Sequence, residues 1–201
     1  MKRDVQGKIK LKSYLKIQEE RPKKALKILK SQPHLATARI SKPCKWIEGS
    51  TALHWAAHQG SLELVKRLVK LGADINDAQA DWWCRPIDWA ADSGSFEIVD
   101  YLIKKGADLS GDQWSNCTPL HVAAQGGSTN GKKRKKRYGK TANLLIQGNC
   151  EINALAQYGG GPPAMTPLDD ALKVGNKIVA QVIQRAGGLT AKEIKDKRTK
   201  M

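Results

Sequence analysis

Aromatic side chains and long apolar runs are scarce in this sequence. Its 201 residues include one Phe beside six Trp and four Tyr, so aromatic packing falls mainly to Trp. No run of about 18 apolar residues occurs, and no membrane-spanning helix is therefore expected. The first residues, MKRDVQGKIK, have no apolar segment after their basic side chains, so we expect no secretory signal.

Cysteine is also rare, with four residues and no C-x-x-C pair. None of the four has a histidine at metal-ligand spacing, so we expect no metal site. We interpret Cys44, Cys84, Cys117 and Cys150 as reduced thiols of an intracellular protein.

Acidic residues are fewer than basic residues, and the two kinds are unevenly distributed along the chain. The net charge is +16. Residues 1–45 hold 14 Lys/Arg against 3 Asp/Glu, residues 46–127 hold 6 against 11, and residues 128–201 hold 15 against 5. A protein kept soluble by charge alone does not need this segregation. It indicates that the basic parts meet an acidic partner, which is nucleic acid, an acidic protein surface or a membrane surface.

The middle of the chain repeats itself. "TALHWAAHQGSLELVKRLVKLGADIN" (51–76) aligns without a gap on "RPIDWAADSGSFEIVDYLIKKGADLS" (85–110). A third copy begins "TPLHVAAQGG" (118–127), and a fourth reads "TPLDDALKVGNKIVAQVIQRAGG" (166–188). Within a copy, small Ala residues on one helical stretch precede a Gly, and apolar residues then recur at helical spacing. One such unit cannot bury its apolar face alone, so neighbouring copies are expected to stack.

These residues resemble the ankyrin repeat, whose signature is T-P-L-H-x-A-A, then a Gly, then a second helix that ends in G-A-D. The copies start at Thr51, Arg85, Thr118 and Thr166, and the resemblance covers roughly residues 46–188. It implies an all-α repeat fold, a solenoid of about four to five helix-turn-helix units with β-turn fingers. It also implies a protein-interaction module without catalytic activity.

The remaining residues flank this array. We divide the chain into a basic N-terminal extension with a degenerate capping repeat (1–45), the repeat domain (46–189) and a basic C-terminal tail (190–201). Residues 21–39 look like a second repeat helix with its outgoing turn, and 10–20 look like the helix before it. Thr190 is a plausible N-cap for a short, charged tail helix.

A basic insertion interrupts the third copy. The second helix should begin after Gly127, but the apolar columns resume only with Leu144, Leu145 and Ile146, so residues 128–137 are a ten-residue insertion, expected as a loop. Its start, "GGSTNGKK", nearly matches a phosphate-binding loop. Lys133 stands where that motif needs a hydroxyl, and the preceding "HVAAQ" is helical rather than a strand. We therefore reject a nucleotide site.

The run KKRKKR has three readings: a solvated loop, a nuclear import signal, or direct docking on an acidic partner together with the basic termini. Aromatic residues are nearly absent there, so stacking on single-stranded bases is not expected. Nucleic-acid backbone and acidic protein tails are both candidate partners. The candidate acidic-partner residues are Lys132, Lys133, Arg134, Lys135, Lys136, Arg137, Lys8, Lys10, Lys12, Lys195, Lys197 and Arg198.

A second candidate surface follows from the resemblance, which implies that finger tips and the concave helix face bind protein partners. An exposed finger Trp would be a natural anchor, although packing between adjacent fingers is an equal alternative. The candidates are Trp46, Trp82, Trp83 and Trp114 in the fingers, and His58, Gln59, Asp92, Ser93 and Gln125 on the concave face. Trp55 and Trp89 share a column that the family turns toward the core, so we interpret them as structural.

The histidines of the repeat motif suggest structure rather than catalysis. The resemblance implies that His54 and His121 bond to the Thr of the same motif and to the backbone of the next unit. Arg85 and Asp88 replace the Thr and His in the second copy and are expected to form an i, i+3 ion pair. No catalytic residue, cofactor, metal or small-molecule substrate is predicted.

Two functions of different class remain from the sequence. The first is a non-catalytic structural or adaptor subunit that docks through its basic tails and insertion on an acidic surface of a large assembly, such as a ribonucleoprotein, a ribosome or a ciliary microtubule. The second is a soluble nuclear or cytoplasmic regulatory adaptor whose KKRKKR is an import signal. The first favours the cytoplasm, including cytoskeletal or organellar assemblies, and the second allows the nucleus.

Overall fold

The computed structural model describes residues 14, 16, 17, 21–39, 49–78, 84–126, 132–160 and 164–200. Over these residues the chain is helical and forms no strand, only the isolated bridges Arg39–Thr51 and Ala156–Met165. The α-helices are α2 (Pro22–Ser31), α3 (Ala52–His58), α4 (Leu62–Lys70), α5 (Pro86–Asp92), α6 (Phe96–Lys104), α7 (Pro119–Gln125), α8 (Lys132–Gln147), α9 (Pro167–Lys173), α10 (Lys177–Arg185) and α11 (Ala191–Thr199), with 3-10 turns η1 (Pro33–Ala36) and η2 (Tyr158–Gly160). The predicted all-α repeat fold is confirmed.

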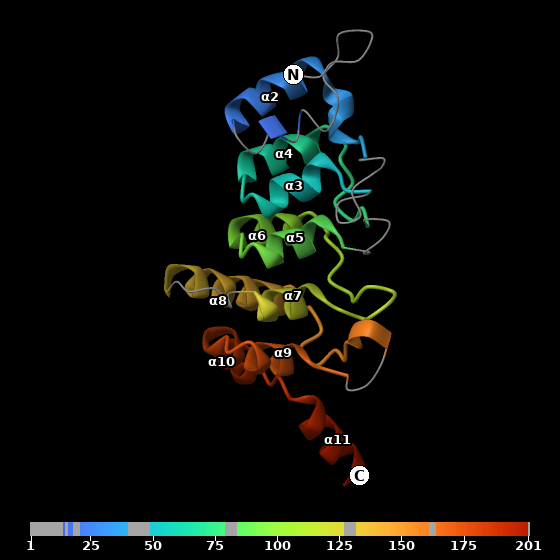
Figure 1. The fold of residues 1–201 in the computed structure, drawn as a ribbon, viewed down its shortest axis with the longest axis vertical. Coiled ribbons are helices and arrows are strands. Elements are labelled where there is room, and N and C mark those ends of the chain that lie inside the picture. Colours follow the sequence, from blue (N-terminus) through green and yellow to red (C-terminus); the bar gives the residue numbers. More distant parts are fainter. Residues whose placement is uncertain are drawn as a thin grey trace.

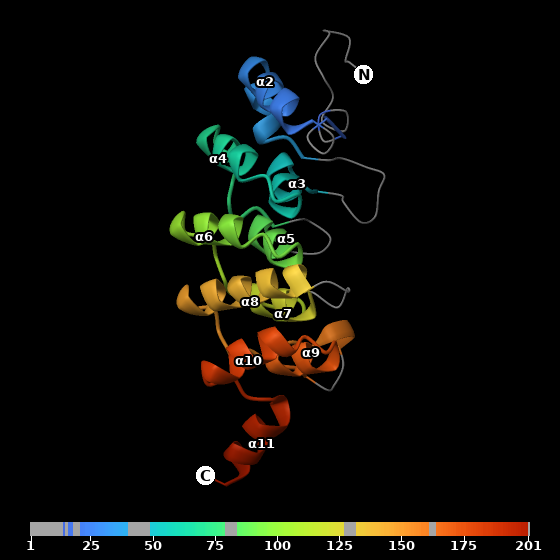
Figure 2. The same cartoon turned by 90° about the vertical axis from the view of Figure 1, so that its left-hand side faces the viewer.

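The helices stack as pairs into an elongated solenoid that runs from α2 at one end to α11 at the other (Figure 1). The short helices α3, α5, α7 and α9, here called the inner helices, form one layer (Figure 2). The helices α2, α4, α6, α8 and α10, here called the outer helices, form the second layer. The connecting turns, or fingers, project beside the inner helices, and this face is here called the finger side.

Each repeat start read from the sequence is the N-cap of an inner helix. Thr51, Arg85, Thr118 and Thr166 all have extended backbone and precede α3, α5, α7 and α9. Pro follows directly in three of the four copies, where its missing N–H costs nothing. The helix starts therefore follow from local capping chemistry as well as from stacking.

Histidine side chains link successive units as the resemblance implied. His54 Nδ1 accepts the Thr51 N–H at 3.1 Å, so its Nε2 carries the proton and donates to the Cys84 carbonyl at 3.1 Å. His121 repeats this arrangement with Thr118 and the Met165 carbonyl. Burial lowers the pKa of His54 to about 4, and burial also lowers the pKa of His121. Both rings are thus neutral structural links at physiological pH.

The core is a set of repeating columns. Small Ala side chains on the inner helices allow close approach, and the outer helices contribute larger apolar residues. Fully buried columns on the outer helices are Leu64–Ile98–Thr141–Val179, Val65–Val99–Ala142–Ala180 and Leu68–Leu102–Leu145–Ile183. Gly72, with φ +86°, ends α4 in the left-handed conformation expected of a helix C-cap.

The basic insertion differs from its prediction. Residues 132–137 are not a loop: they form the first part of α8, which has 16 residues where α4, α6 and α10 have nine. The register resumes at Tyr138, in the column of the N-caps Ser61, Ser95 and Asn176. The ten-residue offset read from the sequence is therefore consistent with the structure, but most of the cationic run extends a helix.

The tail helix α11 begins at the predicted residue. Thr190 Oγ1 accepts the Glu193 N–H, and Glu193 Oε2 accepts the Thr190 N–H at 2.8 Å, which together make a capping box. Asp169 Oδ2, in the repeat-motif column that holds His54 and His121, accepts the Ala191 N–H at 2.8 Å. The last unit thus uses the motif position to hold the start of α11 rather than a further repeat.

Candidate functional site

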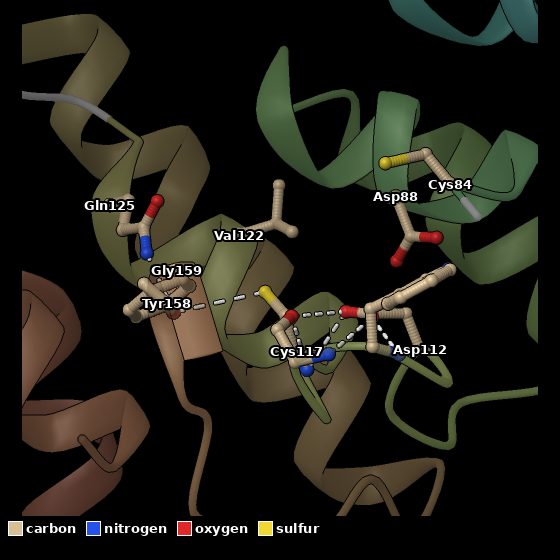
Figure 3. A pocket seen from close by; sticks show the side chains of 10 residues that line it. Cys84, Asp88, Asp112, Cys117, Val122, Gln125, Tyr158 and Gly159 are labelled. Carbon is tan, nitrogen blue, oxygen red and sulfur yellow. Dashed lines mark hydrogen bonds between the residues drawn. The ribbon is translucent and has the colours of Figure 1, made fainter. Parts of the chain in front are cut away.

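The described residues enclose a pocket of about 580 Å³ on the finger side, here called the finger pocket. It lies between α5, α7, the finger before α7 and η2. Its lining residues are Cys84, Asp88, Asp112, Trp114, Ser115, Cys117, Val122, Gln125, Tyr158 and Gly159. Asp88 and Cys84 lie on one wall, and Gln125 and Tyr158 lie on the opposite wall (Figure 3).

Asp112 organises the finger that forms the pocket's rim. Its carboxylate accepts the N–H groups of Trp114, Ser115 and Cys117 at 2.7–3.0 Å and the Ser115 hydroxyl at 2.6 Å. Although burial opposes ionisation, the hydrogen bonds from Ser115, Trp114 and Cys117 lower the pKa of Asp112. The fixed turn leaves Trp114 78% exposed, which matches the first of the two alternatives that the sequence left open for the finger Trp residues.

Tyr158 forms the opposite wall through a polar network. Its hydroxyl donates to Asp170 Oδ2 at 2.6 Å and accepts from Gln125 Nε2 at 2.7 Å. Burial, followed by the nearby Cys117 thiol and the bond to Asp170, raises the pKa of Tyr158. The ring, 39% exposed, therefore offers a neutral aromatic surface across the pocket from Trp114.

The titratable groups of the pocket argue against nucleophilic chemistry. Burial is the main cause that raises the pKa of Cys84 and of Cys117 to about 12, so both thiols stay protonated. Burial also raises the pKa of Asp88 to about 7. Within the described part of the chain, no group of three or more His, Cys, Asp or Glu side chains could hold a metal ion.

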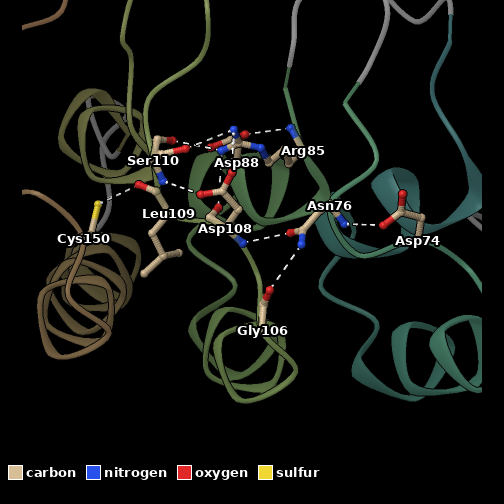
Figure 4. A network of polar contacts seen from close by, with 9 residues as sticks. All are labelled: Asp74, Asn76, Arg85, Asp88, Gly106, Asp108, Leu109, Ser110 and Cys150. Carbon is tan, nitrogen blue, oxygen red and sulfur yellow. Dashed lines mark hydrogen bonds and ion pairs between the residues drawn. The ribbon is translucent and has the colours of Figure 1, made fainter.

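A second polar network ties neighbouring fingers together (Figure 4). Arg85 was expected to pair with Asp88, and this expectation is wrong. The Arg85 guanidinium pairs with Asp108 Oδ2 at 3.0 Å and donates to the Ser110 carbonyl. Asp88 instead accepts the Arg85 backbone N–H at 2.7 Å. Asn76 bridges to the Gly106 carbonyl and the Asp108 N–H. The fingers are thus cross-linked by side chains rather than by a sheet.

The other predicted concave-face residues lie along the inner helices. His58 and Asp92 belong to successive units, and the distance from His58 Nε2 to Asp92 Oδ2 is 3.4 Å. The Ser93 hydroxyl donates to the Ala90 carbonyl of its own unit. Gln59 is partly buried, and its Nε2 has no hydrogen-bond partner among the described residues. Trp55 and Trp89 pack edge to face at 5.8 Å and contact the core, but both remain partly exposed. Trp55 and Trp89 therefore have the predicted structural role, and each also contributes exposed ring surface to the finger side.

Several predicted residues lie outside the finger pocket. Lys136 and Arg137 are exposed on α8, and Arg137 Nε donates to the Gly94 carbonyl at 3.1 Å. Lys195, Lys197 and Arg198 are exposed on α11. Trp46, Trp82, Trp83, Cys44, Lys8, Lys10 and Lys12 lie outside the described residues.

Sequence reasoning missed two features. Tyr158 lines the pocket and Asp170 accepts its hydroxyl hydrogen bond, and the only local signal was the extra length of the turn that holds Tyr158. It also missed a cleft of about 500 Å³ between α2 and α4, whose lining is mostly lysine. Lysine at i, i+4 and i+7 in "KKALKILK" was the signal that could have located it.

Comparison with known proteins agrees with the stacked helix pairs. Residues 17–113 match the family model described as ankyrin repeats (3 copies). A 36-residue stretch is 61% identical to the Notch-regulated ankyrin repeat-containing proteins of Xenopus tropicalis, Xenopus laevis and Homo sapiens. That stretch is 18% of this chain and 32% of each relative, so the match spans about a third of the relatives' length. In the described residues no helix is long and apolar enough to cross a membrane.

Proposed function

Because this chain carries ankyrin repeats, which are protein-interaction modules, we propose that it is a non-catalytic structural or adaptor subunit of a large assembly. In this role the repeat stack is a rigid body. Its basic side docks on an anionic surface, and its finger side receives a protein partner.

The observation that carries this proposal is the sorting of charge by face. Helix α2 has four lysines and no acid, and α8 has seven cations and no acid. Most acids of the described residues lie instead on the inner helices and fingers, and the outer helices α4 and α6 add only Glu63, Glu97 and Asp100. The acids of the inner helices and fingers are Asp74, Asp77, Asp88, Asp92, Asp108, Asp112, Asp169 and Asp170. A field of this kind attracts an anionic surface to the outer helices and repels it from the finger side.

The cationic run gains a fixed position from its place in α8. Tyr138 is buried and its hydroxyl donates to the Asp92 carbonyl at 2.6 Å, while Arg137 bonds the Gly94 carbonyl. These carbonyls end α5, so the beginning of α8 is fastened to the neighbouring unit. A helix held in this way loses less conformational entropy on docking than a free loop would.

The proposed anionic surface is that of a ribonucleoprotein, such as a ribosome, or of a ciliary microtubule. Lys132–Arg137 and the tail residues Lys195, Lys197 and Arg198 would contact it, together with Lys8, Lys10 and Lys12. This proposal assigns the protein to the cytoplasm, including cytoskeletal or organellar assemblies. Its support is the charge pattern, together with the thiols of Cys117 and Cys150, which form no disulfide among the described residues.

The alternative is a soluble regulatory adaptor whose KKRKKR is a nuclear import signal. Its support is the sequence of the run itself, which fits a short basic import motif. It differs from the first proposal in one physical respect, since it needs no salt-sensitive contact with a large particle.

Replacing Lys132, Lys133, Arg134, Lys135 and Lys136 by Gln tests the two proposals, and it keeps the Arg137 anchor and helix propensity. Cell extract is fractionated at low and high salt. Docking predicts that the wild type sediments with a large particle at low salt only, and that the variant does not. A matched variant with Lys104, Lys105, Lys173, Lys177 and Arg185 changed to Gln should still sediment.

Loss of nuclear signal with unchanged sedimentation supports the import alternative. No change in either assay overturns both proposals and leaves the run as a solvated surface. The substitution Trp114→Ala tests the finger side separately. This variant should still associate with the particle and should lose affinity only for the protein partner of the finger side.

A further inference from the structure

A basic cleft lies between the outer helices α2 and α4, here called the α2–α4 cleft. Its volume is about 500 Å³. The two helices pack side by side at the N-terminal end of the stack (Figure 1). The lining residues are Lys23, Leu26, Lys27, Lys30, Glu63, Lys66, Arg67 and Lys70.

The cations of this cleft are not neutralised by ion pairs within the described part of the chain. Among the described residues, no carboxylate forms an ion pair with any of the five lysines or with Arg67. Lys66 lies 5.9 Å from the Tyr101 ring, and the Arg67 Nε is buried without a hydrogen-bond partner. Six like charges around one cleft repel each other, so the arrangement costs the free protein stability. An external anion would remove that cost.

The lining distinguishes between classes of anionic partner. Protein–protein interfaces are depleted in Lys and enriched in aromatic residues and Met, whereas nucleic-acid interfaces are strongly positive. The α2–α4 cleft has five lysines, one apolar side chain and no aromatic residue. Without an aromatic residue it offers no platform for stacking unpaired bases, so its contacts would fall on backbone phosphates. The aromatic residues that suit a protein partner, Trp114 and Tyr158, lie in the finger pocket instead.

We propose that the α2–α4 cleft binds the phosphodiester backbone of a double-stranded nucleic acid without reading its sequence. The inference rests on the proposed docking of the basic side and names the chemistry of the surface that it meets. It also places a contact inside the folded stack, in addition to the α8 run and the tails. Lysines at i, i+4 and i+7 on α2 and at i, i+4 on α4 form a row along each wall, with the Cβ atoms of successive lysines about 5–6 Å apart.

Glu63 supplies a control of opposite sign within the same cleft. It lies in the first turn of α4, where a carboxylate favours the helix dipole, and it is exposed. Its charge opposes a phosphate in the cleft. Glu63→Gln should therefore tighten duplex binding, while a lysine change loosens it.

The experiment measures binding of the full chain to a fluorescent, mixed-sequence duplex of about 24 base pairs by anisotropy, between about 50 and 200 mM salt. Lys27→Gln, Lys66→Gln and Lys70→Gln are combined in one variant. Losing three phosphate contacts should reduce the slope of log affinity against log salt by about 2.7. The affinity lost across this salt range should then be roughly 40-fold smaller for the variant than for the wild type. The control combines Lys105→Gln, Lys173→Gln and Lys177→Gln and should keep the wild-type slope.

The outcomes separate this inference from the proposed function. If the cleft variant keeps the wild-type slope while the α8 variant loses affinity, docking stands and the cleft assignment is wrong. If the wild type does not bind the duplex at all, the assignment is also wrong, and particle sedimentation decides the docking proposal. If polyglutamate of similar charge binds as tightly and depends on the same lysines, the partner is an acidic polypeptide and the nucleic-acid assignment is overturned. All three lysines are exposed and their removal relieves repulsion in the cleft, so the variant should unfold at or slightly above the wild-type temperature.

Discussion

Asp88 occupies the repeat-motif column in which His54 and His121 are buried. Its carboxyl group is almost fully enclosed, and within the described part of the chain it accepts a hydrogen bond from the Arg85 N–H at 2.7 Å. Arg85 directs its guanidinium to Asp108 instead. Burial is the main reason that the pKa of Asp88 is raised to about 7, although the hydrogen bond from the Arg85 N–H and the Arg85 charge oppose the rise.

Asp88→Asn should stabilise the protein more at pH 8 than at pH 5. The folded carboxyl keeps its proton up to about pH 7, whereas the unfolded one releases it near its ordinary pKa of 3.8. Between these values the folded state binds more protons, so wild-type stability falls as pH rises. Asn keeps an acceptor for the Arg85 N–H and carries no charge. We expect the stabilisation to grow by about 2–4 kcal/mol from pH 5 to pH 8, measured by urea unfolding.

The titration of His54 lowers stability as the pH falls, whereas that of Asp88 lowers stability as the pH rises. The His54 titration does not affect the comparison between wild type and Asp88→Asn. The pKa of His54 is lowered to about 4, so protonation of the unfolded state destabilises the protein as pH falls below about 6.5. That loss is common to the wild type and the variant at each pH and cancels in their difference. An Asp88→Asn effect that is equal at pH 5 and pH 8 would show that the carboxyl is not the buried, protonated group described above.

At the scale of elements, α8 is the clearest departure from the repeat. Its first turns carry six consecutive cations, which repel each other at i, i+4 and do not favour a helix by themselves. Tyr138 provides the compensating contact, because its ring is buried against Gly94 and Gly126 and its hydroxyl bonds the Asp92 carbonyl. Tertiary anchoring, rather than propensity, therefore holds this helix.

Gly126→Ala should destabilise the protein by about 2–3 kcal/mol. The backbone at Gly126 has φ −64°, which any residue adopts, but a Cβ there would overlap the Tyr138 ring. In a Tyr138→Ala background the same change should cost little, because the ring is gone. The measurement is a double-mutant cycle of urea unfolding, with the four proteins compared at one pH. Additive costs would mean that Tyr138 does not occupy this site.

The repeat was readable from the sequence because its rules are local. The four starts coincide with N-caps, and the apolar columns coincide with the buried faces of α4, α6 and α10. The helical state of residues 132–137 was not readable, because it depends on an anchor against a different unit. The finger pocket needed Tyr158, which comes from a turn longer than the repeat predicts, and the α2–α4 cleft needed the packing of two helices. The composition showed an excess of basic residues, but it did not show which of them lie together in the folded chain.

At the scale of the whole molecule, the separation of charge gives the solenoid two unlike sides. The outer helices offer lysine-rich surface, and the finger side offers carboxylates with two exposed aromatic rings. One rigid body can thus hold an anionic partner and a protein partner at once without competition between them. The proposed scaffold role depends on this separation.

The same separation predicts that salt stabilises the free protein. Net charge is +16, and the cations of the α2–α4 cleft lack acidic partners among the described residues, so screening should relieve repulsion. We expect the free energy of unfolding to rise by about 0.5–1 kcal/mol between about 50 and 500 mM NaCl. The cleft variant with three Gln substitutions should gain less. Urea midpoints at the two salt concentrations measure both effects, and a midpoint that falls with salt would mean that attractive pairs dominate the surface.

The most direct test of the two-sided account is a map of where an anionic ligand meets the folded chain. Amide chemical shifts of the isotope-labelled protein are followed while a mixed-sequence duplex is added at low salt. The account predicts shifts concentrated on α2, α4, the first turns of α8 and the tail helix α11, with the finger that holds Asp112 and the inner helix α9 unchanged. Shifts that gather on the finger side, or that spread evenly over both layers, would contradict it.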